Sequence, residues 1–288
     1  DTKATRDISL YDAKQMITGA PGSKLKLRVL RTNSKPATLT VTRGISSIPA
    51  VKGEVNGGVG VVKVFSLEKG QAEKVRAQVK SLKDKGISKI ILDLRNVAIG
   101  DLNEGVSVAN AFVKEGDIAQ VIGRENKPTQ TYKADSAKHI YDGEVVAIID
   151  LGTAGAGEIV ASALLENKRG EVVGERSFGA GTEQQLFTLR GGDGLLLTVA
   201  KWASASGKSF LSEKRSESGV KPSVEVKRPD TPEPIEVAEL VENKEEDPSD
   251  PNSADPKEGP KKVKPPKEDM QMKKALEILR GKSKAAGA

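Results

Sequence analysis

The chain has 288 residues, which is enough for one medium-sized domain with attachments. It contains no cysteine, so disulfide bonds, thiolate metal sites and cysteine catalysis are excluded. The net charge of +6 divides into +9 over residues 1–228 and −3 over residues 229–288. Because the basic residues form neither dense runs nor a pattern interleaved with aromatics, they predict a solvated surface and no nucleic-acid partner. No metal-ligand spacing or Gly-rich phosphate loop is present, so we expect neither a metal nor a cofactor.

Residues 1–45 predict a small β-rich module. Ser9 is placed to cap a short helix with apolar spacing from Leu10 to Ile17. Alternating residues at Lys24–Leu30 and at Ala37–Thr42 predict a β-hairpin. This order resembles the carboxyl-terminal half of a PDZ domain, a module that binds peptide termini by adding them to its sheet as a strand.

Residues 46–228 alternate between strand and helix patterns, which is typical of an α/β layered core. Two continuous apolar runs, Ile87–Leu94 and Val145–Leu151, predict strands buried on both faces. Apolar spacing predicts helices at Leu67–Lys85 and Asp101–Val113. Further strands are predicted at Gly57–Phe65, Ile118–Ile122, Thr129–Tyr132, Val172–Val173, Leu186–Leu189 and Gly194–Trp202.

Residues 229–268 differ in composition from the rest of the chain, with nine of its 14 prolines between Pro229 and Pro266. Low hydrophobicity, high charge and dense proline predict a disordered linker. Helical spacing returns at 269–281 through Met272, Ala275, Leu276 and Leu279, which predicts a short helix, either docked or free.

A strand-to-helix turn built from small residues lies at the centre of the core pattern. Residues Gly152–Gly157 follow the strand that ends at Leu151, and Glu158 opens an apolar helix. Such a turn points backbone N–H groups at negative charge, and the helix dipole adds to the effect. Acyl-transfer enzymes place a nucleophile and an oxyanion hole at turns of this kind.

Five segments resemble, in order, the carboxyl-terminal processing peptidases, or tail-specific proteases, a serine-type family with a Ser–Lys dyad. They are residues 9–31, 90–96 (IILDLRN), 141–150 (YDGEVVAIID), 158–179 (EIVASALLENKRGEVVGERSFG) and 195–226. The resemblance covers residues 1–228. It implies a β-β-α superhelical core like that of the crotonases and the Clp peptidase, and peptide or protein carboxyl termini as partners.

The same resemblance implies an extracytoplasmic protein of the bacterial periplasm or envelope. The chain begins with Asp1 rather than methionine, which predicts a piece of a longer protein. It has no apolar run approaching the roughly 18 residues of a membrane-spanning helix. A signal or anchor segment would therefore lie upstream of Asp1.

The catalytic side chains of that family are not retained. The nucleophilic serine sits two residues before the small residue that precedes Glu158, and that position is Gly155. The general-base lysine corresponds to Ala180, 25 residues further on, in agreement with the family spacing. The glutamine that follows the lysine by four residues is present as Gln184. Losing such a nucleophile and base typically removes about 10⁶ in rate.

The oxyanion loop also differs. After Asp93-Leu94-Arg95-Asn96 the family has a glycine pair that helps to shape the oxyanion hole, whereas this chain reads Val97-Ala98-Ile99 before a single Gly100. The backbone N–H groups of Gly100 and Ala156 remain candidates for binding a carbonyl oxygen, because such donors need no side chain.

Two functions are compatible with this pattern. The first is a catalytically impaired pseudo-peptidase that binds extended peptides or protein termini in the old cleft. The second is an active serine-type peptidase with a displaced nucleophile, for which Thr153, Ser162 and Ser177 are the nearest hydroxyls. His139, the single histidine, has no motif around it and is interpreted as a surface loop residue.

Overall fold

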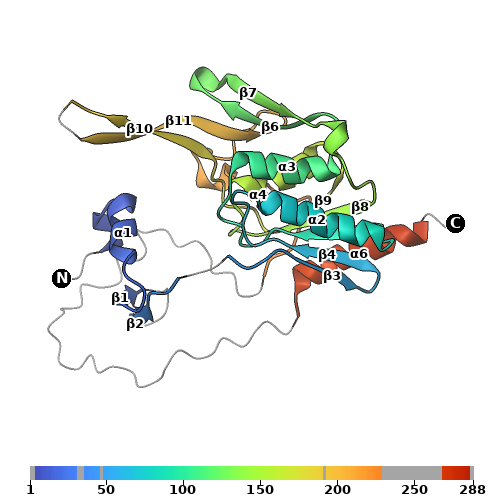
Figure 1. Cartoon of the computed structure of the whole chain (residues 1–288), viewed down its shortest axis with the longest axis horizontal. Coiled ribbons are helices and arrows are strands. Elements are labelled where there is room, and N and C mark those ends of the chain that lie inside the picture. Colours follow the sequence, from blue (N-terminus) through green and yellow to red (C-terminus); the bar gives the residue numbers. More distant parts are fainter. Residues whose placement is uncertain (1–3, 31–35, 46–47, 191–192, 229–267, 286–288) are drawn as a thin grey trace. The chain divides into compact units, whose positions relative to one another are not determined.

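The computed structural model describes residues 4–30, 36–45, 48–190, 193–228 and 268–285. These residues belong to two compact units, one of residues 4–45 and the other of residues 48–228 with 268–285 (Figure 1). The linker predicted at 229–268 lies outside the described residues, except for Glu268.

The first unit contains a helix and a hairpin where the sequence predicts them. Its elements are a 3-10 turn at Thr5–Asp7, helix α1 at Leu10–Ile17, and the antiparallel strands β1 at Lys24–Val29 and β2 at Ala37–Thr42. Arg43 joins the hairpin to the helix, because its guanidinium donates to the carbonyls of Met16 and Ile17. That this unit is half of a PDZ domain stays a prediction.

A six-stranded sheet forms the centre of the second unit. Its strands are β3 at Lys52–Asn56, β4 at Val59–Lys63, β5 at Lys89–Asp93, β8 at Glu144–Ile149, β9 at Gly170–Gly174 and β12 at Val224–Glu225. The order is β12-β9-β8-β5-β4-β3, and only β3 runs antiparallel to its neighbour. The apolar runs that predict fully buried strands correspond to the central strands β5 and β8.

Helices cover both faces of this sheet (Figure 1). One face is covered by α2 at Gln71–Asp84, α3 at Leu102–Phe112 and α4 at Ala156–Glu166, and the other by α6 at Met270–Ala285. The pleat of β5 divides its side chains between the two layers. Ile90 and Leu92 join the core beneath α2, α3 and α4, whereas Ile91 packs in the cluster that includes Ala275 and Leu279 of α6.

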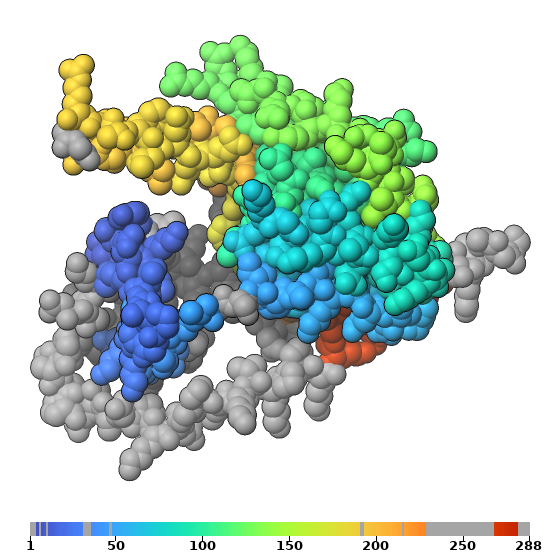
Figure 2. Space-filling model, viewed as in Figure 1, coloured from blue at the N-terminus to red at the C-terminus, as the bar shows by residue number. Residues whose placement is uncertain are grey.

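A second, four-stranded antiparallel sheet has the order β10-β11-β6-β7. Its strands are β6 at Asp117–Ile122, β7 at Pro128–Lys133, β10 at Thr182–Thr188 and β11 at Gly194–Ser204. Only the last four residues of β11 pair with β6, so its earlier part and β10 extend as a hairpin. Figure 2 shows this hairpin as a yellow arm. The mixed α/β fold predicted from the sequence is confirmed.

Helix α2 begins four residues later than its apolar pattern predicts. Leu67 is fully buried and forms an isolated parallel bridge with Gly100 instead of joining the helix. Gly70, with φ of 85°, then turns the chain into α2. The apolar character of Leu67 therefore fixes the loop that contains Gly100.

Candidate active site

Two small-residue loops meet beside the start of α4. The Phe178 N–H donates to the Thr153 carbonyl over 2.8 Å, and the Gly155 N–H donates to the Ala180 carbonyl over 3.1 Å. The positions that the sequence assigns to the nucleophile and the base, 155 and 180, are therefore backbone neighbours. Neither residue carries a group that could attack a carbonyl or accept a proton.

Gly155 has an elbow conformation, with φ of 53° and ψ of −108°. L-residues rarely adopt a positive φ of this kind, and a residue held there typically costs about 1–3 kcal/mol. A Cβ at this position would lie 3.3 Å from the ring atom Cζ3 of Trp202 and 4.0 Å from the Ala180 carbonyl oxygen. A side chain at position 155 would therefore require the Trp202 ring to shift by a few tenths of an ångström, and its Cβ would lie near both that ring and position 180.

Glu158, in the first turn of α4, binds both loops at once. Its Oε1 accepts from the Ser177 hydroxyl over 2.5 Å and from the Gly179 N–H over 2.6 Å. Its Oε2 accepts from the Gly155 N–H over 2.8 Å and from the Ala180 N–H over 2.9 Å. The side chain is fully buried. From the sequence, Glu158 is predicted only to open a helix, although a glutamate at the third helical position is a known capping signal.

Burial raises the pKa of Glu158 from its ordinary 4.5 to about 7, against the opposing effect of the hydrogen bonds from Ser177 and from the three backbone N–H groups. Loss of solvation disfavours the ionised carboxylate, and no cation of the described residues pairs with it to compensate. The folded protein therefore binds a proton at Glu158 more tightly than the unfolded chain does.

This shift predicts that stability depends on pH. The stabilising effect of the raised pKa is complete below about pH 4.5 and is lost as the pH rises through about 7. The free energy of unfolding should fall over that interval by on the order of 3 kcal/mol from this group. Urea unfolding of wild type and Glu158→Gln at pH 5, 6, 7 and 8 measures it. Equal pH slopes in the two proteins would contradict the assignment.

Gly100 and Ala156, the two oxyanion candidates, lie in contact. A Cβ at Gly100 would be 2.9 Å from the Cβ of Ala156 and 2.8 Å from the carbonyl oxygen of Leu67, so only glycine fits there. Among the residues that the structure describes, neither of these two backbone N–H groups meets a protein acceptor. The arrangement leaves two N–H donors next to the elbow.

The altered loop before Gly100 has one buried and one exposed apolar residue. Val97 is fully buried beneath the elbow, and its carbonyl accepts from the Ala154 N–H over 2.9 Å. Ile99 is 62% exposed and borders a hollow of about 470 Å³ between Ile99–Asp101 and Glu68–Gln71. The loop therefore holds the turn through the hydrogen bond from Ala154 to Val97. It also exposes the apolar side chain of Ile99 at the edge of the hollow.

Comparison with known proteins identifies the family. Residues 58–226 match the family described as Peptidase family S41. The chain belongs to this family. The resemblance to carboxyl-terminal processing peptidases is thereby confirmed.

Two curated relatives and a solved structure agree with this assignment. The chloroplastic carboxyl-terminal-processing peptidase 2 of Arabidopsis thaliana is 31% identical over 70% of this chain and 41% of its own. The carboxy-terminal processing protease CtpA of Bacillus subtilis is 30% identical over 79% of this chain and 48% of its own. The structure of a photosystem II D1 C-terminal processing protease superposes with a TM-score of 0.71 at 27% identity, covering 84% of this chain and 65% of that one. The chain spans about half the length of these two curated relatives.

The three hydroxyls that the sequence offers as displaced nucleophiles are all buried and hydrogen-bonded. Thr153, Ser162 and Ser177 are each at most 3% exposed. The Thr153 hydroxyl donates to the Leu94 carbonyl over 3.0 Å, and that of Ser162 donates to a carbonyl three residues back in its own helix. The Ser177 hydroxyl donates to the Glu158 carboxylate. Each hydroxyl proton already has an acceptor within the fold.

The remaining sequence candidates lie outside this cluster of contacts. Gln184 is exposed on β10, immediately after a β-bulge. The His139 side chain is only 9% exposed, and its Nε2 lies 2.9 Å from Asp142, so it is a partly buried, paired residue rather than the surface histidine suggested by the sequence. In the described part of the chain, no three potential metal ligands gather, and no helix is long and apolar enough to cross a membrane.

Proposed function

We propose that this S41 chain is a pseudo-peptidase that binds extended peptides or protein carboxyl termini at the vacated site and does not hydrolyse them. The main support is the backbone contact between Gly155 and Ala180, with N–H to oxygen at 3.1 Å. The positions expected to hold nucleophile and base lie together, yet they offer neither hydroxyl nor amine. A Ser–Lys dyad cannot operate without those groups.

Features that bind a peptide remain at the site. The N–H groups of Gly100 and Ala156 have no protein acceptor among the described residues, and Gly100 also lines the hollow beside Ile99. Backbone N–H groups of this kind bind a carbonyl oxygen whether or not a nucleophile follows. The scaffold therefore supports binding separately from catalysis.

The β10 strand supports an extended, apolar ligand. It begins at Thr182, two residues after Ala180, and is an edge strand of its sheet among the described residues. Extended peptides add to such edges through backbone hydrogen bonds. The hairpin also exposes apolar side chains that a ligand could cover: Leu186, Phe187, Leu189, Leu195, Leu196, Leu197 and Val199.

A charge introduced on β10 should therefore weaken peptide binding. Leu186 is 65% exposed, and burying a leucine typically contributes about 1.5–3 kcal/mol. Leu186→Lys should raise the Kd for an unstructured peptide with an apolar carboxyl terminus by at least about tenfold, which corresponds to 1.4 kcal/mol. Fluorescence anisotropy with a labelled peptide measures the Kd.

Gln130→Lys is the matched control, because it places the same charge at an exposed position of β7, the opposite edge of the sheet. It should leave the Kd within about twofold of wild type. Equal Kd values for Leu186→Lys and Gln130→Lys would place the peptide elsewhere.

Hydrolysis by a displaced nucleophile, the alternative function, has less support. Thr153, Ser162 and Ser177 are buried, and their protons are bound by acceptors within the fold. We also propose, from the family resemblance alone, an extracytoplasmic location, a half PDZ domain at residues 1–45 and a β-β-α superhelical core.

A further inference from the structure

Helix α6 packs tightly on the sheet face opposite α2, α3 and α4. Ala275 and Leu279 are at most 1% exposed and pack among Ile91, Val146 and Ile148. At the middle of the helix, the Leu279 carbonyl accepts from the Lys89 Nζ over 2.6 Å. The contact combines apolar burial with hydrogen bonds, so α6 is part of the fold of the second unit.

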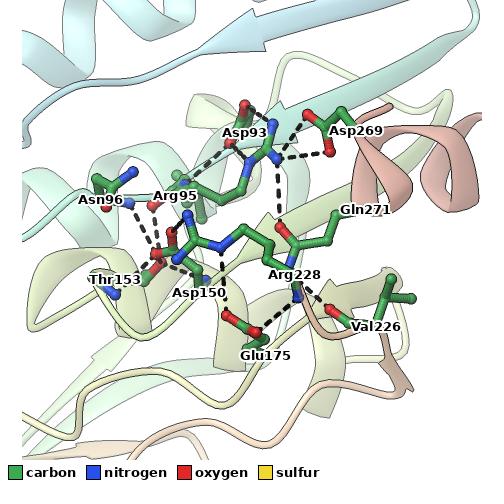
Figure 3. A network of polar contacts seen from close by, with 12 residues as sticks. Asp93, Arg95, Asn96, Asp150, Thr153, Glu175, Val226, Arg228, Asp269 and Gln271 are labelled. Atoms are coloured by element: carbon green, nitrogen blue, oxygen red, sulfur yellow. Dashed lines mark hydrogen bonds and ion pairs between the residues drawn. The ribbon is translucent and has the colours of Figure 1, made fainter. Parts of the chain in front are cut away.

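Asp269 joins the start of α6 to the end of strand β5. Its Oδ1 accepts from the Met272 N–H over 3.0 Å, which makes it the N-cap of the helix. The same carboxylate pairs with the Arg95 guanidinium at 2.8 Å (Figure 3). Next to it, Gln271 is fully buried, and its Nε2 donates to the Val226 carbonyl over 2.9 Å.

Arg95 lies between Asp269 and a second carboxylate. Its Nε and Nη2 donate to the two oxygens of Asp93 over 2.9 and 2.8 Å (Figure 3). Burial alone would raise the pKa of Asp93, but the hydrogen bond from Arg95 and the charge of Lys63 lower it overall. Both partners of this pair therefore stay ionised, and Asp269 adds a second negative charge to Arg95.

The residue after Arg95 continues the network to the elbow. The Asn96 N–H donates to Oδ1 of Asp150 over 2.9 Å, and the same atom accepts from the Gly152 N–H over 2.9 Å. Asp150 is fully buried, and its Oδ2 lies 3.3 Å from the Arg228 guanidinium (Figure 3). The first residues of α6 are thus linked through Arg95 to both the loop at 94–100 and the turn at 150–155.

We propose that α6 is a regulatory helix, whose docking on the back of the sheet holds the loop at 94–100 and the turn at 150–155 in place. Release of α6 removes the Asp269 carboxylate and the Gln271 side chain from Arg95, whose guanidinium then keeps only Asp93 as a side-chain partner among the described residues. The turn and the loop then open more often, because they are joined only loosely once Arg95 moves. Asp150 accepts one backbone N–H from each of them, that of Asn96 in the loop and that of Gly152 in the turn. This coupling rests on the proposed function only for its effect on peptide binding.

Hydrogen exchange of the full chain, measured by mass spectrometry, tests the coupling. Asp269→Asn keeps a good N-cap residue and removes the charge that faces Arg95. It should speed exchange in the segments 94–100 and 150–155 about threefold to tenfold, while the amides of α6 stay protected. Leu279→Asp places a charge in the apolar contact, so it should expose α6 and speed exchange in both segments further.

Glu277→Gln is the control, because it removes an exposed carboxylate of the same helix that pairs only with the exposed Lys274 among the described residues. It should leave hydrogen exchange in 94–100, in 150–155 and in α6 as it is in wild type. The proposal is overturned if Leu279→Asp exposes α6 while 94–100 and 150–155 keep wild-type protection, or if Glu277→Gln matches Asp269→Asn. Protection of α2 in each variant shows that the core is folded.

Peptide affinity measured on the same samples separates this inference from the proposed function. A coupled exchange response together with weaker peptide binding supports both. A coupled response in a chain that binds no peptide, wild type included, supports the regulatory helix and contradicts the proposed function. Peptide binding without a coupled response contradicts the regulatory helix alone.

Discussion

The double variant Gly155→Ser/Ala180→Lys should cleave an unstructured protein that the wild-type chain leaves intact. The two positions are joined by a 3.1 Å hydrogen bond, and a Cβ at 155 would lie 4.0 Å from the Ala180 carbonyl oxygen. A hydroxyl added at 155 would therefore lie close to the backbone that carries the amine added at 180. Because losing a nucleophile and its base costs about 10⁶ in comparable enzymes, even partial rescue should exceed wild type by at least about a hundredfold.

Each single substitution is a control for the pair, since a serine without its base or a lysine without its nucleophile should stay inactive. The positive φ of Gly155 will strain the serine, as it does in other nucleophile elbows. Cleavage is followed by mass spectrometry of the products. A folded double variant that binds peptide but cuts nothing would place the defect in the loop at Val97–Gly100 as well.

Removing the Glu158 carboxylate should be among the most destabilising single changes in the chain. Glu158→Ala leaves the Ser177 hydroxyl and the N–H groups of Gly179 and Ala180 without their acceptor in a buried site. Each orphaned donor typically costs about 1–3 kcal/mol, so a loss on the order of 5 kcal/mol is expected. Glu158→Gln keeps one oxygen acceptor and should cost less.

Urea unfolding at a single pH measures both variants. Glu166→Ala is a matched control in the same helix, because that carboxylate is exposed and, among the described residues, bonds only the backbone and hydroxyl of Ser206. It should lower the free energy of unfolding by less than about 1 kcal/mol. Equal losses for Glu158→Ala and Glu166→Ala would mean that the four contacts of Glu158 contribute little.

Much of the fold was accessible from local sequence patterns. Continuous apolar runs predict β5 and β8 because buried parallel strands require them, and the small residues of 152–157 predict a turn because larger ones could not form it. The family spacing pairs Gly155 with Ala180, and the structure places them side by side. These features depend on periodicity, residue size or spacing, all of which can be read along the chain.

The contacts that sequence reasoning missed depend on residues distant in the chain. The sequence predicts that Glu158 opens a helix. In the structure, its carboxylate oxygens also accept hydrogen bonds from donors in residues 177–180. The pairing of Arg95 with Asp269 joins residues 174 positions apart. Leu67 fits a helical pattern but pairs with Gly100, because a tertiary bridge outweighs local propensity there. No local pattern encodes such partners.

The central claim is that this S41 chain binds peptide and does not cut it, and one sample can test both halves. A labelled unstructured peptide with an apolar carboxyl terminus is titrated with wild-type chain, and the same mixture is then analysed by mass spectrometry after prolonged incubation. We predict a saturable rise in anisotropy and a peptide of unchanged mass. Peptide fragments would contradict the claim if their amount increases with the concentration of the chain and if Leu186→Lys still produces them at a reduced rate.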